Sequence, residues 1–375
     1  MSMKAFVGAD IFDGQTLHHG MALLLENGVF RGIAAVDSTD PAARVMLDGG
    51  TISPGFVDLQ VNGGGGVMFN DHQTVAALET IARAHASTGT AAILPTLITD
   101  TPAHTTAAIE AVEAAIAQKV PGIIGLHLEG PHLSQARKGA HDPALIRPMG
   151  ADDLAQLCAA ARRLPNLMMT LAPESVTPAQ IAALTKAGVI VSLGHSDCSY
   201  ADASAGFAAG ARVATHLFNA MSPLGSREPG LVGAVLDTGP VSVGLIADGI
   251  HVHPASIRSA LAAKRGPGRL FLVTDAMSTV GSSITEFTLN GRRVLRRDGR
   301  LTLENGSLAG ADLDMPKALS VMVNDVGIGL AEALAMATTY PAAVLTDACG
   351  FGQFAPGLPA HAVWLKNDFS VDILR

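Results

Sequence analysis

Aromatic and charged residues are scarce in this 375-residue chain, and each shortage excludes a class of function. Aromatic residues make up 4% and charged residues 15%, and the formal net charge is −8. This acidic balance, without any basic stripe, argues against a nucleic-acid or anionic-membrane surface. No apolar run approaches the roughly 20 residues that a membrane-spanning helix needs. We therefore expect neither a nucleic-acid partner nor a membrane partner.

Cysteine is also scarce. Cys158, Cys198 and Cys349 lie far apart in the chain and are odd in number. Such usage argues against a disulfide framework and is typical of a reducing compartment. We therefore expect a cytoplasmic protein.

Small apolar residues, by contrast, are abundant. Hydrophobic residues make up 48% of the chain, which is enough for a large core. Ala, Gly, Val and Leu dominate, as in parallel α/β folds whose strands are covered on both faces. The length fits either two domains or one large barrel with a small accessory domain.

Short apolar runs bounded by Gly and Pro recur along the chain, and helical segments lie between most of them. Such runs are typical of fully buried strands. They predict eight strands, at residues 56–60, 90–94, 123–129, 167–171, 189–193, 212–215, 241–246 and 270–274. Eight such units in succession predict an α/β fold of the TIM-like (β/α)8 barrel type.

The two ends of the chain differ from this middle part. Residues 1–52 contain short strands and turns, including the hairpin signal Asn27-Gly28, and residues 346–375 look similar. We expect both ends to form one small β-sandwich domain and residues 53–345 to form the barrel. Within the barrel range, residues 281–310 should form hairpins around Asn290-Gly291 and Asn305-Gly306, followed by two helices near 315–324 and 330–339.

Polar residues follow several of the predicted strands, at the barrel end where active sites lie. Glu129, His195 and His216 end strands three, five and six. A buried carboxylate needs a charge partner or a metal, and one oxygen with two imidazoles is a catalytic-zinc ligand set. Asp275, at the tip of strand eight, suits a general base better than a helix cap.

Further candidates follow other strands. Gln60 and Asn62 come after strand one, and Asp248 and His251 after strand seven. In the loops, His141 is either solvated or part of the site. Arg227 is either in a surface ion pair with Glu228 or a phosphate clamp.

Taken together, the motifs resemble the N-acetylglucosamine-6-phosphate deacetylase family of the amidohydrolase superfamily. The likeness covers nearly the whole chain in order. It is carried by Pro54–Asp58, His127–Pro131, Lys138–His141, Gly194–Ser196, Thr215–Met221, Arg227–Gly230, Ala247–His251 and Thr274–Ala276.

The resemblance implies a metal held by Glu129, His195 and His216, with Asp275 as the catalytic acid/base. Implied substrate contacts are Ala140, His141, Asn219, Ala220, Arg227, Asp248, His251, Leu308, Ala309 and Gly310. The family's arginine at the position of Arg227 reaches the phosphate in the neighbouring subunit, which implies a homodimer.

Many amidohydrolases have His-x-His after strand one for a second metal, whereas this chain has Gln60-Val61-Asn62. The fourth strand, residues 167–171, also offers no lysine for a bridging carbamate. We therefore expect one divalent ion per chain, zinc first, with iron, cobalt or manganese as alternatives.

The implied reaction is the hydrolytic deacetylation of N-acetyl-D-glucosamine 6-phosphate to D-glucosamine 6-phosphate and acetate. The alternatives are another N-acetylated sugar phosphate, such as N-acetylgalactosamine 6-phosphate, and a non-catalytic phosphosugar-binding protein. A cyclic-amide hydrolase is less well supported, because the His-x-His and the lysine are missing.

Overall fold

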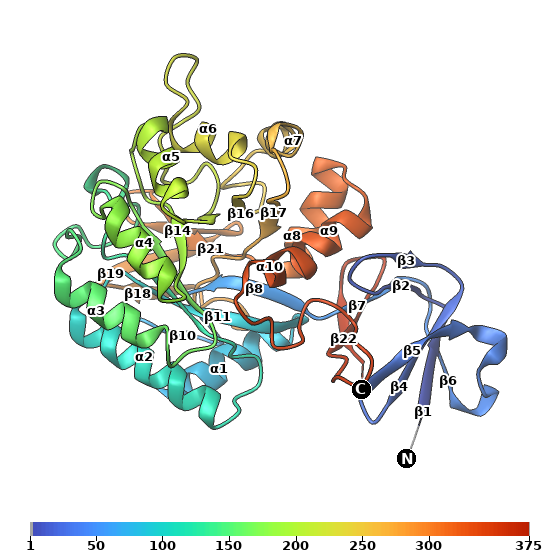
Figure 1. Ribbon diagram of the computed structural model, residues 1–375. Helices are drawn as coiled ribbons and strands as arrows, with labels where there is room; N and C mark the ends of the chain where they lie inside the picture. The colour runs from blue at the N-terminus through green and yellow to red at the C-terminus, as the bar shows by residue number, and fades with distance from the viewer. Residues whose placement is uncertain (1–2, 375) are drawn as a thin grey trace.

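Eight parallel strands form the centre of the molecule, and they follow one another in chain order around a barrel (Figure 1). The computed structural model describes residues 3–374, so the predictions that include Met1, Ser2 and Arg375 lie partly outside it. The strands are β8 (Phe56–Val61), β11 (Thr90–Ile98), β12 (Leu126–Glu129), β13 (Leu167–Leu171), β14 (Ile190–Leu193), β15 (Val213–Ala214), β16 (Ser242–Leu245) and β17 (Leu270–Leu272). The predicted (β/α)8 barrel is confirmed.

The barrel closes between β8 and the residues just beyond β17. Asp275 N–H donates a hydrogen bond to Gln60 O over 3.0 Å. The buried carboxylate of Asp58 strengthens this seam, because Thr274 donates to it from both its N–H and its hydroxyl. The seam therefore places Gln60 beside Asp275, although the two are far apart in the sequence.

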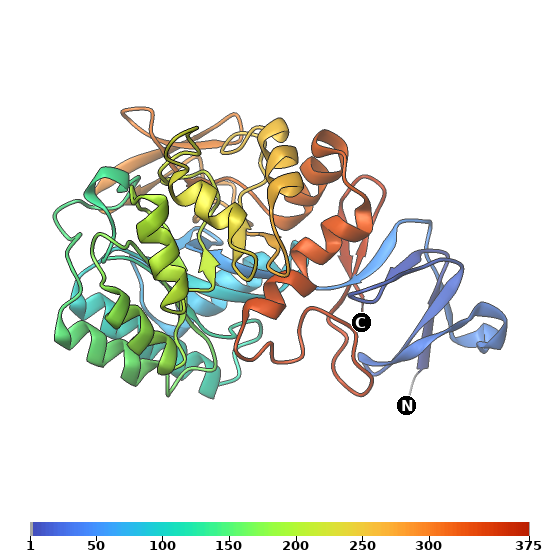
Figure 2. The same ribbon diagram turned by 45° about the horizontal axis from the view of Figure 1, so that its top comes forward.

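Helices cover the outside of the barrel (Figure 2). Every residue of β8, β12, β13 and β14 is consequently buried, as expected for parallel strands. Four helices follow a Thr or Ser whose hydroxyl accepts a hydrogen bond from the N–H three residues on. The helices are α1 (Val75–Ala86), α2 (Pro102–Ala117), α3 (Ala151–Ala160), α4 (Pro178–Lys186), α5 (Tyr200–Ala208), α6 (Gly230–Asp237) and α7 (Pro254–Ala263).

Two elements differ from the prediction. The second strand continues to Ile98, four residues past the predicted end, because Pro95 lies where the register between β8 and β11 shifts. A proline is tolerated at such an irregularity. Helix α6 was not predicted, since Pro229-Gly230 at its start has the composition of a turn.

A four-stranded sheet interrupts the alternation after β17. It consists of β18 (Glu286–Leu289), β19 (Arg292–Arg297), β20 (Arg300–Leu303) and β21 (Leu308–Ala311). Both predicted hairpins are present, and the unpredicted turn Asp298-Gly299 joins them. Ala311 N–H donates to Asp275 O over 3.0 Å, so β21 is tied to the barrel mouth.

The predicted pair of helices after this sheet is broken into four segments. They are α8 (Met315–Ser320), the π-helix η4 (Val321–Val326), α9 (Leu330–Ala337) and α10 (Thr339–Val344). No helix within residues 3–374 is long and apolar enough to cross a membrane.

Both ends of the chain lie together in a small domain beside the barrel (Figure 1). One sheet has the order β5-β4-β1-β6 and the other β23-β22-β7-β2-β3, so the second sheet combines strands from both ends. The strands are β1 (Met3–Val7), β2 (Asp10–Phe12), β3 (Leu17–His18), β4 (Met21–Glu26), β5 (Val29–Ala35), β6 (Arg44–Met46), β7 (Thr51–Pro54), β22 (Ala362–Leu365) and β23 (Val371–Ile373). The β-sandwich is confirmed, while the boundaries at 52–53 and 345–346 remain predictions.

The side chain of Asn166 ties the barrel to the segment that leads back into the small domain. Its Nδ2 donates to Ile124 O and Asp347 O over 2.8 and 2.7 Å. Its Oδ1 accepts from Thr346 N and Asp347 N over 2.9 and 3.0 Å. Asn166 is 1% exposed and Ile124 is 4% exposed, so the barrel side of this anchor is buried.

We expect Asn166→Ala to lower the free energy of unfolding by about 1–3 kcal/mol, because it removes four hydrogen bonds and takes this donor from the buried carbonyl of Ile124. Denaturant titration of purified protein would measure the change. Asn324→Ala is the matched control, since Asn324 is exposed and should change stability by less than about 0.5 kcal/mol. Equal stability of the two variants would contradict the anchoring role.

Candidate active site

A cavity of about 190 Å³ at the C-terminal ends of the barrel strands contains most of the predicted site residues. Glu129 is the last residue of β12, and His195, His216 and Asp275 follow β14, β15 and β17. This is the barrel end where catalysis takes place in such folds. The predicted residues that line the cavity are Asn62, Glu129, Ala140, His141, His195, His216, Asn219, Ala220, His251, Asp275, Leu308 and Gly310.

The three predicted metal ligands meet at one point. Glu129 Oε1 lies 3.2 Å from His195 Nε2 and 3.1 Å from His216 Nε2. The two imidazole nitrogens are 3.0 Å apart. Ligands about 2.1 Å from a tetrahedral ion are separated by roughly 3.4 Å, so this cluster is close to the size that one divalent ion requires.

A backbone hydrogen bond orients the His195 ring so that its other nitrogen can bind a metal ion. Its Nδ1 lies 2.9 Å from Arg137 O, which can only accept a hydrogen bond. The proton is therefore on Nδ1, and Nε2 presents a lone pair to the cluster. A backbone carbonyl that orients a histidine in this way is typical of metal sites.

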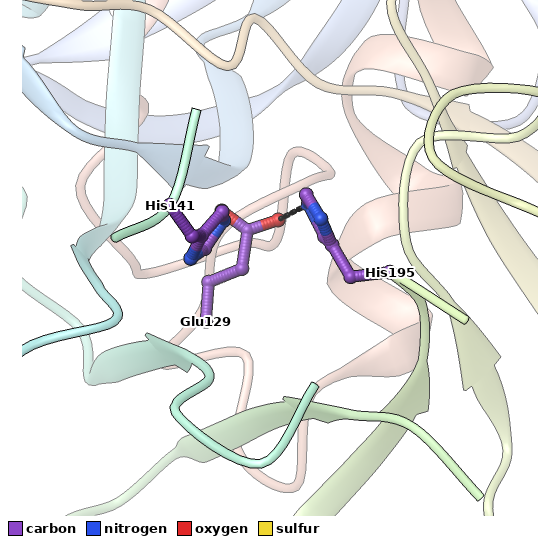
Figure 3. A group of neighbouring side chains, drawn as sticks. All are labelled: Glu129, His141 and His195. Atoms are coloured by element: carbon purple, nitrogen blue, oxygen red, sulfur yellow. Dashed lines mark ion pairs between the residues drawn. The ribbon is translucent and has the colours of Figure 1, made fainter. Parts of the chain in front are cut away.

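His141 lies against the same carboxylate but is oriented differently (Figure 3). By distance alone Glu129, His141 and His195 also form a potential metal site. His141 Nδ1, however, lies 3.3 Å from Thr99 N–H, which can only donate, and 2.7 Å from the Thr99 hydroxyl. A neutral ring that accepts from Thr99 N–H carries its proton on Nε2, which lies 3.8 Å from Glu129 Oε2. In this tautomer His141 is a hydrogen-bond donor into the cavity.

The charges around Glu129 favour a cation. Burial would raise the pKa of Glu129, but the neighbouring His195 and His216 hold it well below its usual range. Burial alone would lower the pKa of His216, yet Glu129 raises it. Burial lowers the pKa of His141 to about 3, so that ring stays neutral. A divalent ion fits these donors, because the buried carboxylate otherwise needs a protonated histidine.

Asp275 is held by the two amides that replace the expected histidines. Asn62 Nδ2 donates to Asp275 Oδ1 over 2.7 Å. Gln60 Nε2 donates to the same oxygen over 3.2 Å and to Glu129 Oε1 over 3.0 Å. Burial, followed by the charge of Glu129, raises the pKa of Asp275 to about 6. Only Oδ2 of this carboxylate remains free of these amide donors.

Three of these residues have a strained backbone. His195, His216 and Asp275 have φ angles of 47°, 31° and 50°. A left-handed conformation costs of order 1–3 kcal/mol for such residues and is concentrated at functional sites. The strain turns each chain segment just beyond its strand, which brings the side chains together.

The other predicted contacts surround this centre. His251 Nδ1 donates to Asp248 Oδ2 over 2.6 Å, which leaves His251 Nε2 as an acceptor in the cavity. Gly310 packs against the backbone of Asp275 so closely that a Cβ would lie 2.9 Å from Asp275 O. Ala309 is fully buried, and it does not line the cavity although its neighbours Leu308 and Gly310 do.

Arg227 lies outside the cavity, on the long loop between β15 and α6 that projects at the top of Figure 1. The alternative ion pair with Glu228 is not formed. Glu228 Oε1 instead accepts from Tyr200 N and Gly230 N over 2.7 and 3.0 Å. Within residues 3–374 Arg227 has no ion pair, and Leu224 on the same loop is 58% exposed.

The sequence reasoning missed Thr99, which orients His141. Thr99 follows β11 directly and thus occupies the same strand-end position as the predicted residues. Because the strand was expected to end at residue 94, this position was overlooked. No sequence signal identifies Arg137, which acts through its backbone carbonyl.

A second cavity, of about 820 Å³, lies between the small domain and the opposite end of the barrel. Leu25, Ile93, Phe351 and Val363 are among its lining residues. Within residues 3–374 it contains no cluster of three potential metal ligands. The group of potential metal ligands found within residues 3–374 lines the smaller cavity.

Comparison with known proteins shows the family of this chain. Residues 51–374 match the amidohydrolase family. The chain belongs to the amidohydrolase family. As such it is a hydrolase, and the metal dependence of this family agrees with the cluster at Glu129.

Three similar proteins have narrower names. This amidohydrolase is 43% identical to an N-acetylgalactosamine-6-phosphate deacetylase from Shewanella sp. (strain ANA-3), over 96% of this chain and 91% of that one. It is 38% identical to an N-acetylglucosamine-6-phosphate deacetylase from Haemophilus influenzae, over 97% and 95%. The crystal structure of N-acetylglucosamine-6-phosphate deacetylase from Pasteurella multocida superposes with a TM-score of 0.93 at 36% identity, covering 98% and 97%.

For this amidohydrolase we expect about one tightly bound divalent ion per chain, because three protein ligands form one cluster and Gln60 and Asn62 are poor ligands. Glu129→Gln should lose the metal and the activity together. Elemental analysis of purified protein measures the metal content. His104→Ala is the matched control, since His104 is exposed and pairs with Asp100 on the surface. Two equally tight ions per active chain would contradict the expectation.

Proposed function

We propose that this protein hydrolyses the acetamide of N-acetyl-D-glucosamine 6-phosphate, giving D-glucosamine 6-phosphate and acetate. One observation carries the proposal. A single cavity contains a potential metal cluster, a half-buried aspartate and a histidine N–H donor. The whole-chain similarity to amino-sugar phosphate deacetylases supports the choice of substrate.

Glu129, His195 and His216 would hold one divalent ion, with zinc first and iron, cobalt or manganese as alternatives. When bound, such an ion supplies Lewis-acid chemistry, which acidifies water and polarises a carbonyl. Gln60 and Asn62 take no part as ligands, because their amide N–H groups face the carboxylates of Glu129 and Asp275.

Asp275 moves the proton that the reaction requires. Its Oδ2 accepts a proton from the attacking water as the new C–O bond forms. The same oxygen then delivers that proton to the amine nitrogen as the C–N bond breaks. In the metal-free site burial and the charge of Glu129 raise the pKa of Asp275 to about 6, and a proton shuttle works best when its pKa is near the ambient pH.

His141 stabilises the charge that develops on the acetyl oxygen. Its Nε2–H faces the cavity next to Glu129, and Thr99 keeps the proton on this nitrogen. A preorganised donor aimed at a developing oxyanion contributes directly to the rate. The ring has no need to change its protonation state during the reaction.

The sugar would lie against the remaining cavity wall. We assign sugar contacts to Ala140, Asn219, Ala220, His251 and the segment 308–310. Asp248 fixes the ring of His251 and thereby leaves its Nε2 as an acceptor for a sugar hydroxyl.

One observation favours a second candidate substrate. The relative from Shewanella, 43% identical to this chain, is named an N-acetylgalactosamine-6-phosphate deacetylase. Acetate release from the two 6-phosphates, measured in parallel on metal-loaded protein, decides between the epimers by their kcat/KM values. Release from neither sugar would leave the non-catalytic phosphosugar-binding protein as the better description.

Arg227 and the loop around it suggest how the phosphate is bound. An exposed leucine and an arginine without an ion pair, on one projecting loop, resemble an interface patch. We propose a cytoplasmic homodimer in which Arg227 enters the partner's site and binds the phosphate. Arg227 does not line the cavity of its own chain, which agrees with this arrangement.

We expect Asp275→Asn to retain the metal and the substrate but to lose turnover by roughly 10²- to 10⁴-fold, because the proton shuttle is removed. The amide oxygen can still accept the hydrogen bond from Asn62, so the site should keep its shape. Steady-state kinetics and metal analysis would show this. Asp237→Asn, on the surface, is the control. Turnover near that of the control would remove Asp275 from the mechanism.

We expect Arg227→Ala to raise KM for the phosphorylated sugar by roughly 10- to 100-fold, since a charge-assisted contact contributes about 1.5–3 kcal/mol. Unphosphorylated N-acetylglucosamine should be affected little. Arg265→Ala serves as the control, because Arg265 is exposed and pairs with Asp237. An equal effect on both sugars would exclude a phosphate contact.

A mixed dimer tests where Arg227 acts. Chains with Arg227→Ala and chains with Asp275→Asn should together regain activity at one site, which combines an intact Asp275 with an intact Arg227 from the partner. Activity assays on dimers purified through two different affinity tags would measure this. Inactivity of a proven mixed dimer would place Arg227 in its own chain's site or outside any site.

A further inference from the structure

A series of buried, hydrogen-bonded side chains lies in the barrel interior, next to the strand ends that supply the proposed metal ligands. His127 Nε2 lies 2.7 Å from Thr170 Oγ1, and Thr170 Oγ1 lies 2.6 Å from Thr215 Oγ1. Ser192 Oγ lies 2.6 Å from Thr215 Oγ1. All four residues are at most 4% exposed. None of them has a part in the reaction described above.

The donor and the acceptor of each hydrogen bond in this series can be assigned. His127 Nδ1 lies 3.0 Å from Leu59 O, which can only accept, so the proton is on Nδ1. Nε2 of the neutral ring then accepts from the Thr170 hydroxyl. Thr170 accepts in turn from Thr215, and Thr215 from Ser192. Every hydroxyl donates in the same direction, so removing one member leaves the hydroxyl that donates to it without its acceptor.

These side chains also lie on or next to each strand that supplies a proposed metal ligand. Thr170 is paired in register with Glu129 of β12 and with Ser192 of β14. Thr215 directly precedes His216. Gly194, which precedes His195, packs on this layer so closely that a Cβ would lie 2.8 Å from Thr215 Cβ and 3.0 Å from Thr170 Cγ2.

We propose that His127, Thr170, Thr215 and Ser192 form a positioning network that sets the spacing of Glu129, His195 and His216 for the metal. The inference rests on the proposed metal site. Because the hydroxyls have fixed donor directions and tight contacts, they hold the ends of β12, β14 and β15 at one separation. Partners behind the ligands commonly change metal affinity or activity by 10- to 100-fold when they are removed.

Thr170→Val tests the network, because it removes the central hydroxyl and keeps the shape. We expect the affinity for Zn²⁺ to fall by about 10- to 100-fold in a competition assay with a chromophoric chelator. With saturating metal, kcat should fall while KM for the sugar phosphate changes less than about twofold. The absorption spectrum of the Co²⁺-loaded protein should also shift, since it reports ligand geometry directly.

Two matched variants separate positioning from folding. Thr170→Ser restores the hydroxyl and should restore the metal affinity. Thr90→Val removes a buried hydroxyl that has no hydrogen-bond partner, at the start of β11, and should leave the affinity unchanged. Thermal unfolding of the metal-free variants shows how much stability each change costs.

The outcomes are distinct. Wild-type metal affinity, kcat and Co²⁺ spectrum in Thr170→Val, with only a lower unfolding temperature, would overturn the network and leave the proposed function intact. A wild-type protein without tight metal would overturn both. If Thr170→Val does not fold, Ser192→Ala replaces it, because it removes only the last donor. It should then weaken metal binding by about 3- to 10-fold, and unchanged binding would overturn the proposal.

Discussion

The buried carboxylate of Glu129 is the charge around which the site is built. It is 2% exposed, and a carboxylate removed from water is stable only with compensating charge or hydrogen bonds. His195, His216 and Gln60 all direct nitrogens at its Oε1 within 3.2 Å. A divalent ion between these groups would satisfy the same carboxylate without requiring a protonated histidine. The need to neutralise Glu129 therefore explains both the ligand cluster and the amide beside it.

Barrel closure is what allows such compensation by residues far apart in the chain. Gln60 and Asp275 belong to the first and last strand ends, yet the seam places their side chains 3.2 Å apart. The carboxylate of Asp58 contributes to this seam through Thr274, the residue just before Asp275. Each site residue then leaves its strand through a sharp backbone turn. The stability of the surrounding barrel offsets the strain of those turns.

Much of the fold could be predicted from the sequence, because parallel strands buried on both faces form continuous apolar runs. The position of Glu129, His195, His216 and Asp275 followed from one rule about strand ends. The same rule missed Thr99 because its strand was expected to end at residue 94. Which nitrogen of each histidine ring faces the cavity could not be predicted, since it depends on the partner of the other ring nitrogen.

Gln60 and Asn62 illustrate how two amides can change the chemistry of a shared scaffold. Histidines at these positions would offer lone pairs and so invite a second cation next to Asp275. Amide N–H groups instead donate to Asp275 Oδ1 directly. A cation beside Asp275 would lower the pKa of its carboxylate strongly, because opposite charge favours the ionised form. The hydrogen bond from Asn62 lowers it less, and in the metal-free site burial and the charge of Glu129 keep it near 6. Amides at these two positions therefore leave Asp275 with the raised pKa that the proposed proton transfer from water to an amine requires.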